Sequence, residues 1–372
     1  MAFQPFAVEQ YLSETEHGVR YNFSESGVHP MTLGDACALA GVDREALWEG
    51  VLDYPQVNGS DRLRAAIAGL YPGAGPENVL VTVGATEANT LVAGALLRPG
   101  ARMLTLTPTY GQLPGNGVNL GAQVVEVPLS ASDGWRLDPC ALRAALSPAP
   151  ALIHVVNPNN PTGQILSDAD RMVLEDAADG SGAWLVADEV YGGTERAGRA
   201  PTASLWRADA RRIVINSLSK AYGLPGLRLG WVVAPEEIIT AMWRRHEYAA
   251  IAAPILSMVL AEAVLQPAAR ARITARARGL IDRGFETFQR HLRTLPGMFT
   301  LTPPMASAMS FVGYDLPIGS EDLARRLRTE CDVLVVPGAR FGCEGHFRFS
   351  SALPEDHLEA GLSRMMDLIK AL

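Results

Sequence analysis

Short apolar runs that alternate with helical segments constrain the fold of this chain more than any other feature. The runs cover residues 79–83, 102–107, 123–127, 151–156, 183–187 and 212–216. Runs of this length, bounded by turn residues, are typical of buried strands. Because helical patterning separates them, they predict an α/β fold with a mostly parallel sheet and right-handed crossovers.

Helical patterning is clearest in three segments. Residues 59–70 are amphipathic and carry a capping serine, and residues 261–293 form a long pattern rich in Ala and Arg. A third helix, 87–97, follows the run at 79–83 through Gly84, Ala85 and Thr86. A strand that enters a helix in this way leaves backbone N–H groups free at the helix N-terminus, where a phosphate can bind.

Composition limits the classes of protein to consider. A chain of 372 residues, 48% hydrophobic and 19% charged, is long and apolar enough for two globular domains. Its formal net charge of −8 gives no electrostatic reason to expect a nucleic-acid partner.

The four cysteines include no CxxC pair, which favours free thiols in a reducing compartment over a metal site or disulfides. The N-terminal residues resemble no secretion signal and no apolar run is long enough for a membrane span, so a cytoplasmic protein is expected.

The segment from Ser217 to Trp231 places one lysine among serines, glycines and an arginine. The amine of Lys220 can form a Schiff base with an aldehyde when its surroundings deprotonate it. Ser217, Ser219 and Arg228 can bind a phosphate, because hydroxyls and a guanidinium suit a dianion. An aldehyde and a phosphate on one small molecule describe pyridoxal phosphate (PLP).

Two upstream motifs supply further groups for such a cofactor. Asp188 follows the run at 183–187, and open α/β sheets bind ligands at the carboxyl ends of their parallel strands. Its carboxylate can pair with a protonated pyridine nitrogen, while Tyr191 and Asn160 can bind a ring hydroxyl. Taken singly, Asn160 is equally a turn residue and Asp188 a helix cap. The coincidence of the three motifs favours the cofactor site.

From about Tyr21 to Leu362, the chain resembles fold type I PLP-dependent enzymes of the class I and II aminotransferase family. Besides the segments above, the matching pieces are Tyr54, Gly59, Leu63-Arg64, Gly84 to Ala88, Pro108 to Tyr110, Val336 to Gly338 and Arg348. The resemblance implies a PLP-dependent transferase fold, with a large domain around a mostly parallel sheet and a smaller α+β domain. We expect residues 1–50 to form an N-terminal arm and part of the small domain, 51–245 the large PLP-binding domain, and 246–372 the C-terminal small domain.

The resemblance also assigns roles to residues of the cofactor site. The expected catalytic residues are Lys220, Asp188 and Tyr191. The expected phosphate contacts are Ala85, Thr86, Ser217, Ser219 and Arg228. Tyr110 is expected to stack on the cofactor ring. A role as an ordinary aromatic side chain of the hydrophobic core fits it equally well.

Two further roles concern the substrate and the partner subunit. Arg348 is expected to bind the substrate α-carboxylate in a bidentate contact, with Asn160 beside it. Tyr54 is expected to reach the phosphate of a neighbouring subunit, which implies a homodimer with shared active sites.

The reaction implied by the resemblance starts from an external aldimine of an α-amino acid, whose Cα proton passes to Lys220. The resulting carbanion is delocalised into the ring. Reprotonation and hydrolysis give transamination, whereas loss of a side-chain leaving group gives elimination, replacement or cyclisation. A regulator that only senses PLP would need a fused DNA-binding region, and the residues before Tyr54 are too few and not basic enough for one.

The loop from Tyr21 to Pro30 departs from the common aminotransferase pattern and resembles that of capreomycidine synthase-like members. Those enzymes cyclise a hydroxylated arginine after eliminating water. Within the loop, Gly27 is a candidate substrate contact, Glu25 can pair with a guanidinium and His29 can act as an acid or base. A solvated glutamate and a structural histidine are the alternatives. The sequence therefore leaves two functions open: an aminotransferase, or a PLP-dependent lyase or cyclase of specialised metabolism.

Overall fold

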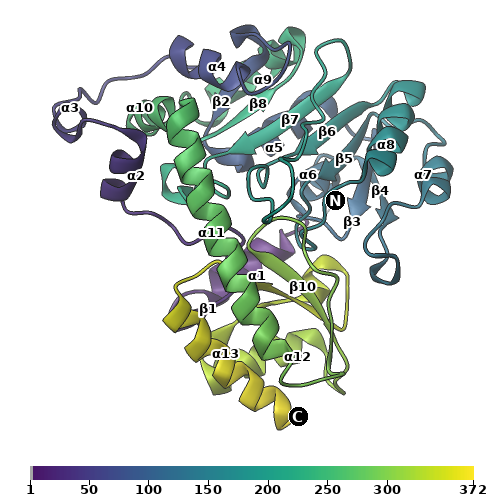
Figure 1. Cartoon of the computed structure of the whole chain (residues 1–372). Coiled ribbons are helices and arrows are strands. Elements are labelled where there is room, and N and C mark those ends of the chain that lie inside the picture. The colour runs from purple at the N-terminus through teal and green to yellow at the C-terminus, as the bar shows by residue number, and fades with distance from the viewer. Residues whose placement is uncertain (1–2) are drawn as a thin grey trace.

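The computed structural model describes residues 3–372, so the first two residues of the predicted N-terminal arm lie outside the described part. The chain forms a larger and a smaller half, and helix α11 (Pro267–Leu292) runs through both of them (Figure 1). The order of strands and helices confirms the predicted α/β fold with a mostly parallel central sheet.

A seven-stranded sheet forms the centre of the larger half. In spatial order its strands are β2 (Val79–Thr82), β8 (Gly230–Val233), β7 (Arg212–Ser217), β6 (Trp184–Asp188), β5 (Leu152–Val156), β3 (Arg102–Thr107) and β4 (Gln123–Pro128). Each of the six predicted apolar runs forms one of these strands. The strand that was not predicted, β8, is antiparallel to both of its neighbours, so the sheet is mostly parallel, as expected.

Helices cover both faces of this sheet, which explains why strands such as β2, β5 and β8 are buried along their whole length. These helices are α4 (Asp61–Ala68), α5 (Gly84–Leu96), α6 (Gln112–Asn119), α7 (Pro139–Ala145), α8 (Asp168–Ser181), α9 (Glu236–Ala249) and α10 (Ile255–Val264). Strand β7 shows the alternation, because Ile213 and Ile215 pack with α5 and α9 while Val214 packs with α8 and α10.

The predicted helices differ from the observed ones mainly at their ends. Helix α4 begins one residue after Ser60, whose hydroxyl accepts a hydrogen bond from the Leu63 N–H at 3.1 Å, as a capping serine should. The pattern at 261–293 forms two helices instead of one, α10 and α11. The break falls before Pro267, because proline has no N–H for the preceding turn but fits the first position of a new helix.

The smaller half combines both ends of the chain. Its strands are β12 (Val336–Pro337), β13 (His346–Ser350), β10 (Met309–Tyr314) and β9 (Phe299–Thr300) in one antiparallel sheet, and β1 (Tyr21–Asn22) beside β11 (Val333–Leu334). Its helices are α1 (Ala7–Thr15), α12 (Ser320–Cys331) and α13 (Glu355–Lys370), whereas α2 (Leu33–Ala40) and α3 (Arg44–Trp48) lie on the side of the larger half, where Ala36 of α2 packs in the core. Phe23, Phe288 and Phe349 stack in the core of the smaller half, so the N-terminal strand is part of this half.

Helix α11 contributes to the cores of both halves. Ile273 packs with the sheet of the larger half, whereas Phe285 and Phe288 belong to the smaller core. Met258 of α10 also packs in the larger core. The predicted boundary at residues 245 and 246 stays a prediction, and this packing favours a boundary inside α11.

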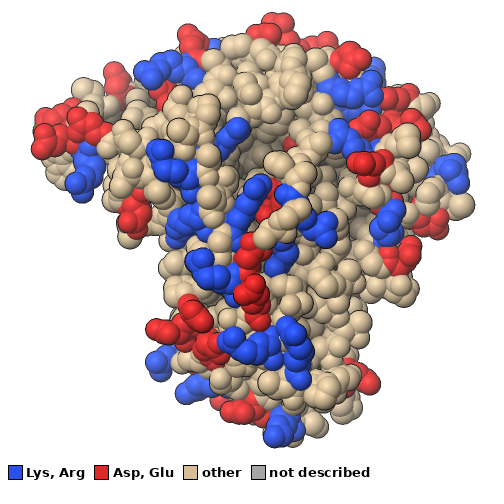
Figure 2. All heavy atoms as spheres, viewed as in Figure 1, with Lys and Arg blue, Asp and Glu red and all other residues tan. Residues whose placement is uncertain are grey.

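Charged side chains of both signs are interspersed over the surface shown in Figure 2, and basic side chains follow the course of α11 between the two halves. A search of the helices within residues 3–372 finds none that combines the length and the apolar character needed to cross a membrane.

Two glycines of α11 test how closely this helix packs. A Cβ on Gly284 would overlap the carbonyl oxygen of Ser351, whereas a Cβ on Gly279 would meet only the end of the Arg283 side chain. Gly284→Ala is therefore expected to lower the free energy of unfolding by about 2 kcal/mol or more. Gly279→Ala is expected to raise it slightly, by up to about 1 kcal/mol, because alanine favours the helix. Equal effects of the two changes in urea unfolding would contradict this packing.

Candidate active site

A cavity of about 280 Å³ lies at the carboxyl ends of the parallel strands, and ten of the predicted site residues line it. These ten are Ala85, Thr86, Tyr110, Asn160, Asp188, Tyr191, Ser217, Ser219, Lys220 and Arg228. They come from segments that are far apart in the sequence but end at the same edge of the sheet, where open α/β sheets bind ligands.

Donors of hydrogen bonds gather at one end of the cavity. Helix α5 begins at Gly84, directly after β2, and Ser217 and Ser219 follow from β7. Arg228 lies against this helix start: a Cβ on Gly84 would be 2.6 Å from its Nη2 atom, and the φ angle of Gly84 is +73°. Only glycine allows that approach. Backbone N–H groups at a helix N-terminus, two hydroxyls and a guanidinium fit the phosphate of PLP.

Lys220 lies deeper in the cavity. Its Nζ donates a hydrogen bond to the Ser26 hydroxyl at 2.7 Å. Burial lowers the pKa of Lys220, and the charge of Arg348 acts in the same direction, whereas Glu25 opposes it. A lysine with a lowered pKa holds more of its amine in the neutral, nucleophilic form that a Schiff base requires.

Asp188 ends β6 and is buried. Its carboxylate accepts hydrogen bonds from the Val190 N–H at 3.2 Å and from Asn89 Nδ2 at 3.3 Å. Burial raises the pKa of Asp188 to about 6, and these hydrogen bonds oppose that rise. A cationic ring nitrogen would stabilise the carboxylate form, so this position suits the pyridinium of PLP.

Arg348 connects the cavity to the smaller half. It lies on β13 with 2% of its surface exposed, and its Nη1 donates to Asn160 Oδ1 at 2.9 Å. Asn160 in turn donates to the Tyr191 hydroxyl at 3.1 Å. A second guanidinium nitrogen, Nη2, donates to the Ser24 carbonyl at 2.6 Å. The site is therefore assembled from both halves and the N-terminal loop, and this guanidinium can offer two parallel donors to a carboxylate.

The structure brings some predicted substrate contacts to the cavity and not others. A Cβ on Gly27 would lie 3.6 Å from Lys220 Cδ, so this residue borders the lysine. Glu25 is exposed and acts on Lys220 through its charge. His29 lies outside the cavity lining: its N–H donates to the Ala352 carbonyl, and its carbonyl accepts from Arg276. Tyr54 is 83% exposed and does not line the cavity of its own chain.

Four polar cavity residues were not predicted as site residues from the sequence: Glu9, Ser26, Asn89 and Gln112. Glu9, on α1, accepts a hydrogen bond from the Tyr110 hydroxyl at 2.7 Å. Asn89 could have been found, because it lies one helical turn after Ala85 on α5. No spacing in the sequence connects Glu9 to Tyr110.

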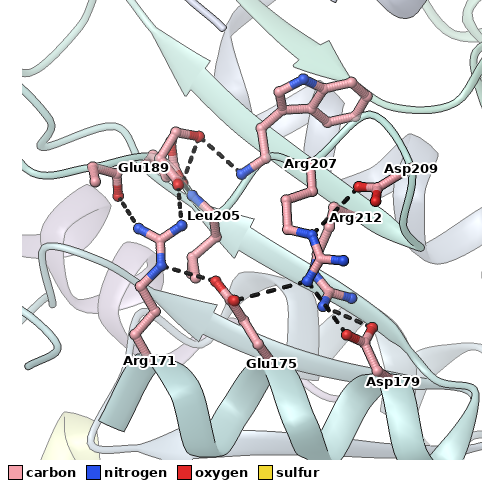
Figure 3. A network of polar contacts seen from close by, with 11 residues as sticks. Arg171, Glu175, Asp179, Glu189, Leu205, Arg207, Asp209 and Arg212 are labelled. Carbon is pink, nitrogen blue, oxygen red and sulfur yellow. Dashed lines mark hydrogen bonds and ion pairs between the residues drawn. The ribbon is translucent and has the colours of Figure 1, made fainter. Parts of the chain in front are cut away.

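A polar network holds the strand end that carries Asp188 (Figure 3). Glu189 accepts hydrogen bonds from the Leu205 N–H at 2.7 Å and the Ser204 hydroxyl at 3.1 Å. Arg171 of α8 donates to the Ala203 carbonyl at 2.9 Å and pairs with Glu175. Because Glu189 and Arg171 both bind the chain from 203 to 205, these contacts hold that loop against the end of β6 and α8.

Comparisons with known proteins agree with this chemistry. The family model for aminotransferase class I and II matches residues 36–365. Capreomycidine synthase from Streptomyces vinaceus is 33% identical over 374 residues, which cover 97% of this chain and 92% of that protein. A solved PLP-dependent aminotransferase from Streptococcus suis superposes with a TM-score of 0.93 at 30% identity, covering 100% of this chain and 99% of that one. The PLP-dependent cyclase OrfR gives a TM-score of 0.90 at 26% identity, covering 100% and 98%.

The buried carboxyl group of Glu189 predicts that the free energy of unfolding depends on pH. Burial raises the pKa of Glu189 from 4.5 to about 7. The folded state therefore binds this proton more tightly than the unfolded state, and its contribution to the free energy of unfolding is lost as the pH rises through about 7. Glu189→Gln keeps an oxygen acceptor without the charge, so the variant is expected to be about 1–2 kcal/mol more stable than the parent at about pH 8 and little changed at about pH 5. Urea unfolding at both pH values measures this, and identical pH profiles would contradict it.

Proposed function

The chain belongs to the aminotransferase class I and II family, whose enzymes use PLP, and on this premise we propose that it is an aminotransferase acting on an α-amino acid. The similarity to capreomycidine synthase confirms the resemblance expected from the sequence. The observation that supports the proposal is that Lys220 and Asn160 line one cavity and that Arg348 donates a hydrogen bond to Asn160. Transamination needs an amine at the substrate Cα and a cation at its carboxylate.

Each residue then has a defined task. Bound PLP supplies an electron sink for negative charge at the substrate Cα. Arg348 binds the substrate carboxylate through its guanidinium, in place of the contacts with Ser24 and Asn160. Lys220 Nζ removes the Cα proton, and the Ser26 hydroxyl orients this amine. Asp188 holds a proton at the ring nitrogen, and Tyr191, hydrogen-bonded to Asn160, holds the ring hydroxyl.

We further propose that the enzyme is a cytoplasmic homodimer with shared active sites. Trp48, Val51, Leu52 and Tyr54 are between 75% and 87% exposed, and they follow one another along a projecting segment of the chain. Exposed apolar side chains of this size favour burial against a partner. A second copy of the chain would cover them and would bring its Tyr54 to the phosphate end of the cavity.

One observation favours a second candidate function, elimination or cyclisation of an arginine-derived substrate in antibiotic biosynthesis. The Glu9 carboxylate lies in the cavity beside Tyr110, and the charge of Glu25 reaches both Lys220 and Arg348. Two carboxylates near a substrate site suit a guanidinium or ammonium side chain. The similarity to capreomycidine synthase and to the cyclase OrfR supports this alternative.

Product analysis distinguishes the two functions. PLP-loaded enzyme is mixed with a panel of amino acids, including arginine and its hydroxylated forms, without any oxo acid. The proposed aminotransferase is expected to yield an oxo acid stoichiometric with enzyme, and the cofactor to become its amine form, by mass spectrometry and absorbance. Catalytic loss of water with the amino group retained would contradict this and establish the alternative. Lys220→Ala is the control, expected to yield neither product.

Glu9 provides a separate test of the substrate class. If Glu9 pairs with a cationic side chain, Glu9→Gln is expected to lower kcat/KM for arginine-type substrates by about tenfold or more, because hydrogen bonds to charged groups contribute about 1.5–3 kcal/mol. Neutral amino acids should be unaffected. The matched control is Glu14→Gln, which changes an exposed glutamate of the same helix that accepts a hydrogen bond from Gln10. Equal losses for cationic and neutral substrates would contradict the pairing.

A further inference from the structure

His246 is a fully buried histidine outside the cavity, in the last turn of α9. Its Nδ1 lies 2.8 Å from the Glu87 carboxylate on α5, and its Nε2 lies 3.1 Å from the carbonyl oxygen of Val57. Both partners are hydrogen-bond acceptors. Neither the proposed reaction nor the predicted cofactor contacts use this residue.

The geometry defines the protonation state of the pair. A neutral imidazole has one N–H donor and one lone pair, so it cannot donate to two acceptors. The lone pair of a neutral ring would face an oxygen atom of Val57 or Glu87, and the two would repel each other. The ring is fully buried, so no water can hydrogen-bond to that nitrogen instead. A proton on each ring nitrogen satisfies both contacts.

The ends of two helices favour a positive charge on His246 and a negative charge on Glu87. His246 lies at the C-terminus of α9, where the helix dipole stabilises a cation. Glu87 lies in the first turn of α5, where the dipole stabilises an anion, and its second oxygen accepts from the Val83 N–H at 2.6 Å. The alternative, a protonated Glu87 beside a neutral histidine, would give up both of these interactions. Within residues 3–372, Glu87 is the only carboxylate that pairs with His246.

The two partners of His246 belong to the two segments proposed to bind phosphate: the start of α5 in the same chain, and the Tyr54 loop in a neighbouring one. Glu87 directly follows Thr86, at the helix start that offers its N–H groups to the cavity. Val57 lies three residues after Tyr54, and the next residue, Asn58, accepts a hydrogen bond from the Val81 N–H at 3.1 Å. One imidazole ring therefore connects the loop of Tyr54 to the N-terminus of α5.

We propose that His246 is a positioning residue for the phosphate-binding site: a doubly protonated side chain that fixes the Tyr54 loop against the start of α5. Through this loop it sets where Tyr54 emerges, and through Glu87 it sets the direction of the helix start. The inference rests on the proposed function, in that the PLP phosphate binds at Gly84 to Thr86.

The protonation state can be observed in the folded holoenzyme without any variant of uncertain stability. Nitrogen NMR of protein labelled at its seven histidines reports each ring nitrogen separately. His246 is expected to show two protonated ring nitrogens at neutral pH, because both of its partners are hydrogen-bond acceptors. A single unprotonated ring nitrogen on His246 at neutral pH would overturn the proposal.

A pair of variants tests the positioning role. His246→Gln can satisfy only one of the two acceptors, and it is expected to weaken PLP binding about tenfold, measured as the dissociation constant by absorbance. The matched control is His291→Gln, which breaks another histidine–glutamate pair, His291 with Glu359 at 2.7 Å, in the smaller half. That variant is expected to lower the melting temperature while leaving PLP affinity unchanged. Equal PLP affinities of the two variants would overturn the positioning role.

Arg228→Ala separates this role from the proposed phosphate site. If Arg228→Ala weakens PLP binding but His246→Gln does not, only the positioning role is wrong. If neither variant weakens it, the phosphate does not bind at this helix start, and the positioning role is overturned with the site. Weaker binding in both, with His291→Gln unchanged, supports the proposal.

Discussion

The buried guanidinium of Arg348 is the interaction on which the assembly of the active site depends. A charge with 2% exposure is costly unless its N–H groups are hydrogen-bonded. Here the partners come from two other parts of the chain, Asn160 after β5 and the Ser24 carbonyl in the N-terminal loop. The same cation therefore brings together the smaller half, the larger half and the loop. A substrate carboxylate that replaces these contacts binds at the point where the three parts meet.

Burial acts in opposite directions on the two ionisable groups proposed to contact PLP, and both effects favour the neutral form. It lowers the pKa of Lys220 and raises the pKa of Asp188 to about 6. A neutral lysine amine is ready to attack an aldehyde, and an aspartate that is costly to ionise gains most from a cationic partner. Burial at the same end of the sheet thus prepares both groups, Asp188 at the end of β6 and Lys220 just after β7.

Much of the fold followed from the sequence, because apolar runs and turn residues mark strand ends locally. The six predicted strands appear in the central sheet, and the motifs around Asn160, Asp188 and Lys220 lie at their carboxyl ends. Strand β8 was missed because its first two residues, Gly230 and Trp231, fall inside the motif that was interpreted as phosphate binding. Glu9 was missed because its contact with Tyr110 is tertiary: the two residues are 101 positions apart, and no periodicity connects them. The roles assigned to Glu25 and His29 remain predictions.

Helix α11 enters both hydrophobic cores without interruption, and this gives the molecule a particular mechanics. Ile273 is anchored in one core and Phe288 in the other, four turns along the same rod. Any closure of one half over the other must bend or roll this helix, since no slack linker is available along that path. Because Glu9 and Ser26 line the cavity beside residues of the larger half, any such bending of α11 would also change the shape of the cavity.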